Sequence, residues 1–152
     1  MRTPLLIFLT VVAGFVPAVL TPDVHAQGQA AGDTTTIWSG VFSDIQARRG
    51  EKIVGNSCSG CHGPDLEGGD SGPKLAGPIF LKKWSDKTVW ELFDFIQTGM
   101  PQDSPGSLNK VNVANLVAYI LEANKASPGT SDLPVDQAAL AKIRIVGQVP
   151  KK

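Results

Sequence analysis

The stretch Cys58-Ser59-Gly60-Cys61-His62 carries the strongest signal in this chain of 152 residues. Two thiols three positions apart, followed directly by an imidazole, have the spacing of covalent c-type haem attachment. In one helical turn the two sulfurs and the imidazole project to the same side, so a short segment can hold a porphyrin edge and its iron. The motif therefore predicts one haem c, attached through Cys58 and Cys61, with His62 as an axial ligand of the iron.

Three other interpretations of the cysteine pair are weaker. A structural zinc site usually needs four Cys or His ligands, and the adjacent Cys61 and His62 are badly placed to share one tetrahedral ion. A thioredoxin-type redox pair is expected near a strand-helix-strand pattern, which the sequence lacks. A plain disulfide over so short a span is equally disfavoured, so haem attachment is the favoured interpretation.

Met100 is the second candidate ligand. The chain has two methionines, and the other is Met1. A lone methionine usually fills a gap in a core, but Met100 follows the helix-stopping Gly99 and precedes Pro101, which favours thioether ligation of the iron. A neutral sulfur favours ferrous iron and raises the reduction potential. Because a six-coordinate iron has no open position for substrate, the expected activity is electron transfer and not an enzymatic reaction.

The N-terminal segment has the features of an export signal. Residues 1–26 combine Arg2, an apolar run over residues 5–20 and a small-x-small site ending at Ala26. An uncleaved membrane anchor is the alternative, but the run is shorter than the roughly 20 residues that span a bilayer. We therefore expect a periplasmic or otherwise exported protein with no integral membrane span after cleavage, and a flexible leader over residues 27–36.

The overall charge excludes one class of partner. Lys and Arg number 14 and Asp and Glu number 14, and this neutral balance lacks the basic footprint of a nucleic-acid-binding protein. Four lysines, at positions 74, 82, 83 and 87, either steer an acidic redox partner to the haem edge or form ordinary solvated surface. Both interpretations stay open.

The first expected helix begins after Ser43, a good N-cap, and runs about three turns into Cys58. Gly50 in its middle lowers helix propensity by about 1 kcal/mol relative to alanine. This cost suggests that another backbone approaches closely at Gly50.

Two further helices follow the glycine-rich segment. Ser85 or Asp86 is expected to cap the second, which stops at Gly99, and the third starts near Asn109 and ends before Pro128. Their apolar stripes are Val89, Leu92, Phe93 and Ile96 in the second, and Val113, Leu116, Val117, Ile120 and Leu121 in the third.

The remaining segments are expected to be irregular or peripheral. Residues 63–73 are too rich in glycine and proline for a regular element, and residues 74–81 are expected to continue this loop and line the haem pocket. An apolar cluster at 37–42 should pack on the body, and a weak helical pattern at 136–146 should lie on the outside. The expected organisation is a haem domain over residues 37–128 and a C-terminal extension over 129–152.

Four motifs resemble the class I monohaem cytochromes c: CSGCH at 58–62, GPKLAG at 72–77, TGMP at 98–101 and LVAYI at 116–120. The resemblance implies an all-α fold with three main helices around one covalently bound haem. It also implies that the Pro73 carbonyl accepts from His62, that Leu75 packs on the haem, and that Trp84 donates to a haem propionate, with core packing as the alternative for Trp84. Gly50 and Tyr119 match the family's contact between the N- and C-terminal helices.

The resemblance also implies a function. The chain is similar to small bacterial periplasmic cytochromes c, some of them associated with quinoprotein dehydrogenases. The implied role is single-electron transfer between redox proteins, namely a dehydrogenase, an oxidase or a reductase. One alternative is a permanent electron-transfer subunit of a dehydrogenase. Another is a five-coordinate haem sensor or peroxidase-like protein, in which Met100 stays off the iron.

Overall fold

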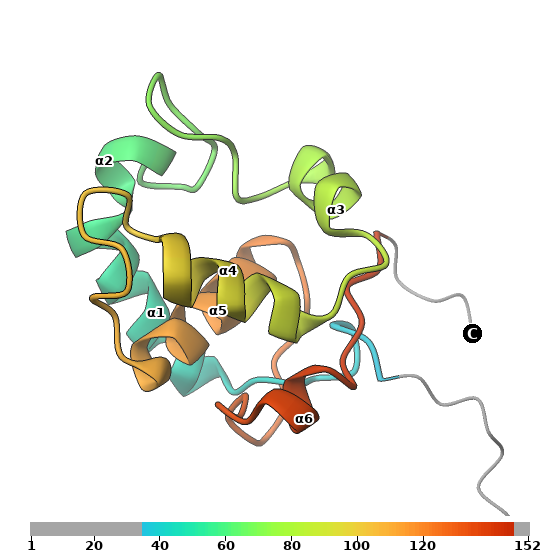
Figure 1. Ribbon diagram of the computed structural model, residues 1–152. Helices are drawn as coiled ribbons and strands as arrows, with labels where there is room; N and C mark the ends of the chain where they lie inside the picture. The colour runs from blue at the N-terminus through green and yellow to red at the C-terminus, as the bar shows by residue number, and fades with distance from the viewer. Residues whose placement is uncertain (1–34, 148–152) are drawn as a thin grey trace, which may run out of the picture. The chain divides into compact units, whose positions relative to one another are not determined.

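The computed structural model describes residues 35–147, so the expected signal at 1–26 and most of the leader at 27–36 lie outside the described residues. The described part is helical, and its three β-bridges are isolated pairs that form no strand. None of its helices is long and apolar enough to cross a bilayer. The helices are α1 (Asp44–Ser57), α2 (Ser59–His62), α3 (Pro78–Trp84), α4 (Val89–Gly99), α5 (Lys110–Ala123) and α6 (Gln137–Leu140) (Figure 1).

The three longest helices, α1, α4 and α5, correspond to the three that the sequence predicts. Ser43 caps α1 as predicted, because its hydroxyl accepts the Gln46 N–H at 3.1 Å. The predicted cap of α4 is wrong: neither Ser85 nor Asp86 but Thr88 takes this position. Thr88 and Glu91 form a reciprocal capping box, in which each side chain accepts the other residue's backbone N–H.

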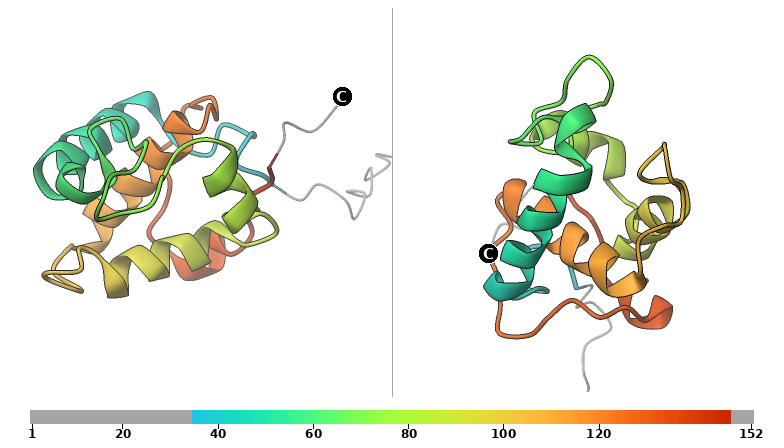
Figure 2. Two further views of the ribbon diagram at one scale, coloured as in Figure 1. Left: turned by 90° about the horizontal axis from the view of Figure 1, so that it is seen from above. Right: turned by 90° about the vertical axis from the view of Figure 1, so that its left-hand side faces the viewer.

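Helix α1 crosses α5 at Gly50, which confirms the predicted close approach. A Cβ atom at Gly50 would overlap the Asn115 carbonyl and lie 2.8 Å from Cβ of Tyr119. Figure 1 shows α5 behind α4 and beside α1, and α5 packs on both. Helix α5 lies between α1 and α4, and the irregular segment after α2 arches away from these helices (Figure 2).

Helix α3 corrects the prediction of a continuous loop over residues 74–81. Pro78 occupies the first turn, where its missing N–H costs no hydrogen bond, and Gly77 precedes it with a φ of 84°. The helix buries Phe80 and Trp84. Only residues 74–77 continue the irregular segment that was predicted.

The C-terminal segment is also different from the prediction. Helix α6 is a single turn, and Leu140, Ile143 and Ile145 are 0%, 7% and 0% exposed, so this segment contributes side chains to the core, while residues 136–138, 141 and 142 are exposed. Alternating Ile143 and Ile145 suit an extended chain better than a helix. Their segment lies between two others: Ile145 N–H donates to Lys87 at 2.8 Å, and the Arg144 carbonyl accepts from Ile37 at 3.0 Å.

The N-terminal apolar cluster packs on the body as predicted, since Ile37 and Phe42 are fully buried.

Two hydrogen bonds connect the C-terminal segment to α1. Buried Gln46 donates to the Leu133 carbonyl at 3.0 Å and accepts the Leu133 N–H at 2.6 Å. Residues on both sides of position 128 therefore contribute to the same core.

Candidate functional site

The cysteine-histidine motif forms the single turn α2 directly after α1. Cys58 lies between the two helices, and its carbonyl accepts the His62 N–H at 2.9 Å. The two cysteines are free thiols, with Cys58 half-buried and Cys61 exposed. Burial, and in second place the neighbouring Cys61, raises the pKa of the Cys58 thiol, so this group is a protonated thiol at neutral pH.

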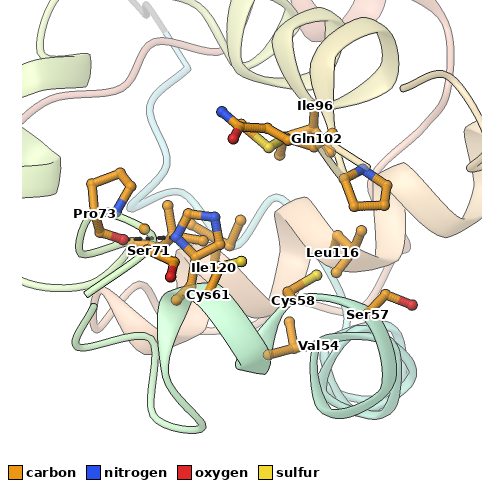
Figure 3. A pocket seen from close by; sticks show the side chains of 15 residues that line it. Val54, Ser57, Cys58, Cys61, Ser71, Pro73, Ile96, Gln102, Leu116 and Ile120 are labelled. Atoms are coloured by element: carbon orange, nitrogen blue, oxygen red, sulfur yellow. Dashed lines mark hydrogen bonds between the residues drawn. The ribbon is translucent and has the colours of Figure 1, made fainter. Parts of the chain in front are cut away.

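A cavity that is partly open to solvent lies beside this turn, and the empty space of about 670 Å³ there includes open solvent. Figure 3 shows Cys58 and Cys61 on one side of it, and Ile96 and Gln102 opposite. Its lining comes from α1, α2, the segment after α2, the end of α4 with the following loop, and α5: Val54, Ser57, Cys58, Cys61, His62, Ser71, Gly72, Pro73, Leu75, Ile96, Met100, Pro101, Gln102, Leu116 and Ile120.

His62 is 9% exposed and is held by the loop that follows it. Its Nδ1 lies 2.7 Å from the Pro73 carbonyl oxygen, so the hydrogen bond implied by the family resemblance is present (Figure 3). Gly72 makes room for this contact, because a Cβ there would lie 3.0 Å from Nδ1 of His62 and 2.8 Å from the Cys61 carbonyl oxygen. The Gly68 N–H donates to the His62 carbonyl at 2.8 Å and closes the loop.

Met100 lines the same cavity from the end of α4. It caps this helix in an extended conformation, with its N–H donating to the Ile96 carbonyl at 3.0 Å. Apolar side chains of the same two helices also line the cavity, namely Ile96 from α4, and Leu116 and Ile120 from α5. The structure thus brings Met100 and the three motif residues, Cys58, Cys61 and His62, together around one space.

Leu75 also lines the cavity, and a residue that sequence reasoning missed holds it in place. Asn124, at the end of α5, is 3% exposed. Its amide donates to the Leu75 carbonyl at 2.9 Å and to the Ile120 carbonyl at 2.8 Å, and its oxygen accepts the Gly77 N–H at 2.9 Å. An asparagine just after a helical stripe is a C-cap signal that would have identified it.

Trp84 is the one proposed haem contact that the structure does not bring into the cavity. It is 7% exposed, and its ring centroid lies 6.1 Å from that of Phe80 and 5.7 Å from that of Phe95. It lines a separate surface hollow on α3 and α4, together with Lys83 and Lys87.

The lysines of the proposed steering group are partly engaged in ion pairs. Lys74 pairs with Glu67 at 3.0 Å, and Lys87 pairs with Glu91 at 3.3 Å. Lys82 and Lys83 are exposed near the end of α3. Steering by this group stays a prediction.

Comparison with known proteins assigns the class. A family model described as cytochrome c oxidase, cbb3-type, subunit III matches residues 45–120, which is half of the chain and includes the motif and Met100. The fold and this match define a cytochrome c domain. The chain belongs to the family of subunit III of the cbb3-type cytochrome c oxidases.

The curated proteins include no significant match to this chain. Among solved structures, the crystal structure of the sulfane dehydrogenase SoxCD from Paracoccus pantotrophus is similar, with 21% identity and a TM-score of 0.48. The match covers 76% of this chain and 62% of that chain, so this chain spans less than two thirds of that chain's length.

The cytochrome c family implies a covalent haem c, and the residues around the cavity fit this group. Two free thiols, an imidazole and a thioether are the donors that haem c uses. The rest of the lining is mainly apolar, as a porphyrin face requires. The absence of a side chain at Gly72 keeps the loop close to His62.

Proposed function

We propose that this chain is an exported monohaem cytochrome c that carries single electrons between larger redox enzymes. The observation that supports this most strongly is that Cys58, Cys61, His62 and Met100 all line one mainly apolar cavity. The cytochrome c family agrees with electron transfer as the general activity.

In this proposal each donor has a separate role. Cys58 and Cys61 would form the thioether links, and His62 on α2 and Met100 at the end of α4 would be the two protein ligands of the iron. When bound, the haem supplies an iron that cycles between the ferric and ferrous states. With both of these ligands the iron would have no open position, which would favour electron transfer over substrate chemistry.

The apolar wall has an electrostatic role. Ile96, Leu116 and Ile120 line the cavity with apolar side chains. Burying a charge in apolar surroundings costs free energy, so this wall disfavours the more highly charged ferric state. The neutral Met100 thioether acts in the same direction, and both raise the reduction potential.

The proposed partners are exported redox proteins. The name of the matching family describes a subunit of an oxidase, which supports electron exchange with a larger enzyme. Whether this chain is a free carrier or a permanent subunit is decided by size-exclusion chromatography of the protein from its native source. A free carrier elutes as a monomer, and a permanent subunit co-elutes with its enzyme.

The first experiment tests covalent attachment. The protein is expressed with a haem-attachment system, and its mass and pyridine haemochrome spectrum are recorded. One haem per chain with two thioether links is expected, and Cys58→Ser and Cys61→Ser should each remove one link. A chain without covalent haem would disprove the proposal. The same mass measurement tests cleavage after Ala26.

The second experiment tests the axial ligand. Ferric wild-type protein should show the long-wavelength charge-transfer band of a methionine-iron bond and should not bind carbon monoxide when reduced at neutral pH. Met100→Ala should lose the band and bind carbon monoxide. Gln102→Ala is the matched control, because Gln102 also lines the cavity but has no sulfur. A wild-type protein that binds carbon monoxide readily would favour a five-coordinate sensor or peroxidase-like protein.

A further inference from the structure

The loop over residues 101–108, which follows Met100, has few attachments to the protein. Two of its hydrogen bonds are internal turns, from Ser104 N–H to the Pro101 carbonyl at 3.0 Å and from Ser107 N–H to the Ser104 carbonyl at 3.2 Å. Its middle, residues 102–107, is exposed to solvent. Within residues 35–147, one hydrogen bond connects this loop to another part of the chain, and Gln97 makes it.

Gln97 lies in the last turn of α4, next to Ile96 of the cavity wall. Its Nε2 donates to the Leu108 carbonyl at 2.5 Å, across eleven positions of sequence. Its Oε1 is buried and has no hydrogen-bond partner among the described residues. A buried amide oxygen without a partner costs free energy, so the contribution of this side chain lies mainly in its bond to Leu108.

The hydrogen bond from Gln97 to Leu108 attaches the loop to α4 at its C-terminal end, whereas Met100 lies at its N-terminal end. Met100 begins the loop and is attached to α4 through its N–H bond to Ile96. Leu108 ends the loop and directly precedes Asn109, the N-cap of α5. With both ends attached to α4, the loop has fewer conformations in which the Met100 side chain can leave the cavity.

We propose that Gln97 is a positioning residue for Met100, which holds the methionine loop closed and so favours the methionine over competing ligands of the iron. This inference rests on the proposed function, since it requires Met100 as a ligand. Gln97 does not line the cavity and acts through the loop.

The test is a titration of the ferric holoprotein with imidazole. Binding is measured as the decrease of the methionine-iron absorption band. Imidazole binds only when Met100 has left the iron, so its affinity reports how readily the loop opens. In Gln97→Leu we expect imidazole to bind about 3- to 10-fold more tightly than in wild type, the range that one net hydrogen bond provides. Gln97→Glu keeps the size of the side chain but at neutral pH replaces the amide donor with an acceptor that repels the Leu108 carbonyl, and should show at least this gain.

Thr98→Val is the matched control. Thr98 is the next residue of α4, and its hydroxyl donates to the Asp94 carbonyl at 2.7 Å within the same helix. This variant loses one hydrogen bond to a backbone carbonyl but no loop contact, so its imidazole affinity should equal that of wild type.

The outcomes separate this inference from the proposed function. A wild-type protein without the methionine-iron band would overturn the ligand assignment itself. A wild-type protein with the band, whose imidazole affinity is unchanged in Gln97→Glu, would overturn only the role of Gln97. Equal gains in Gln97→Glu and Thr98→Val would also overturn it, because they would indicate general loosening of α4.

Discussion

Nδ1 of His62 lies 2.7 Å from the carbonyl oxygen of Pro73, which is eleven residues further along the chain. A carbonyl oxygen can only accept, so Nδ1 carries the proton and Nε2 keeps its lone pair. The loop after α2 therefore decides which imidazole nitrogen is available to a metal. It does so through a backbone atom, whose position depends on the rigid ring of Pro73.

Changing Pro73 should alter the electronic character of His62. In Pro73→Ala the backbone gains freedom, and the weaker hydrogen bond makes the imidazole a poorer electron donor to ferric iron. We expect the reduction potential to rise by roughly 20–60 mV, since a tenfold change in the equilibrium constant corresponds to about 59 mV for a one-electron couple. Potentiometric titration measures this shift. Pro64→Ala, in the same loop, is the control, and an equal shift in both variants would contradict the prediction.

The contact between α1 and α5 at Gly50 should tolerate no side chain. In Gly50→Ala the new methyl group would collide with the Asn115 carbonyl and Cβ of Tyr119. We expect a loss of about 3 kcal/mol in the free energy of unfolding, measured by denaturant titration. Gly55→Ala is a control on the same helix with no heavy atom within 4 Å, and it should gain up to about 1 kcal/mol. A Gly50→Ala variant with the wild-type free energy of unfolding would contradict this prediction, because it would show that α1 and α5 can move apart without loss of stability.

Replacing Asn124 should weaken the attachment of the segment around Leu75, which lines the cavity, to the end of α5. Asn124→Ala removes three side-chain hydrogen bonds and leaves the Gly77 N–H and the Leu75 carbonyl without these partners. We expect a loss of about 3 kcal/mol in unfolding free energy. Asn112→Ala, in the first turn of α5, should change it by no more than about 0.5 kcal/mol. Thermal melts of the holoproteins compare the two, and equal melting temperatures would refute the role given to Asn124.

Asp132 should make stability depend on pH. The hydroxyl of Ser43, and after it the guanidinium of Arg49, lowers the pKa of Asp132. A lowered carboxyl pKa stabilises the fold above the unfolded-state pKa, and this contribution is lost as the pH falls through the folded-state pKa, which lies below 3.8.

Asp132→Asn should therefore be less stable than wild type at pH 7, by no more than about 1 kcal/mol because the pair is exposed. The difference should shrink as the pH falls below 3.8. Melting temperatures between pH 2 and pH 7 measure it, with Asp103→Asn on the exposed loop as the control. A deficit that is constant with pH would mean that the carboxylate charge plays no part.

Much of the site could be predicted because its signals are local. The spacing of Cys58, Cys61 and His62 requires only one helical turn, and α2 is such a turn. Met100 follows a helix end, which the glycine before it indicates. The cap of α4 was missed by two or three positions because several polar residues precede it, and only the reciprocal contact of Thr88 with Glu91 selects one.

The sequence by itself determined the candidate donors, the three long helices and the close approach at Gly50, because spacing, helical periodicity and the cost of a glycine are properties of neighbouring residues. Only the tertiary structure decided which distant groups meet. Asn124 reaches Leu75, Gln97 reaches Leu108, Ile143 and Ile145 enter the core, and Trp84 turns away from the cavity. These outcomes depend on how helices and loops pack, and packing joins residues whose separation in sequence carries no periodic signal.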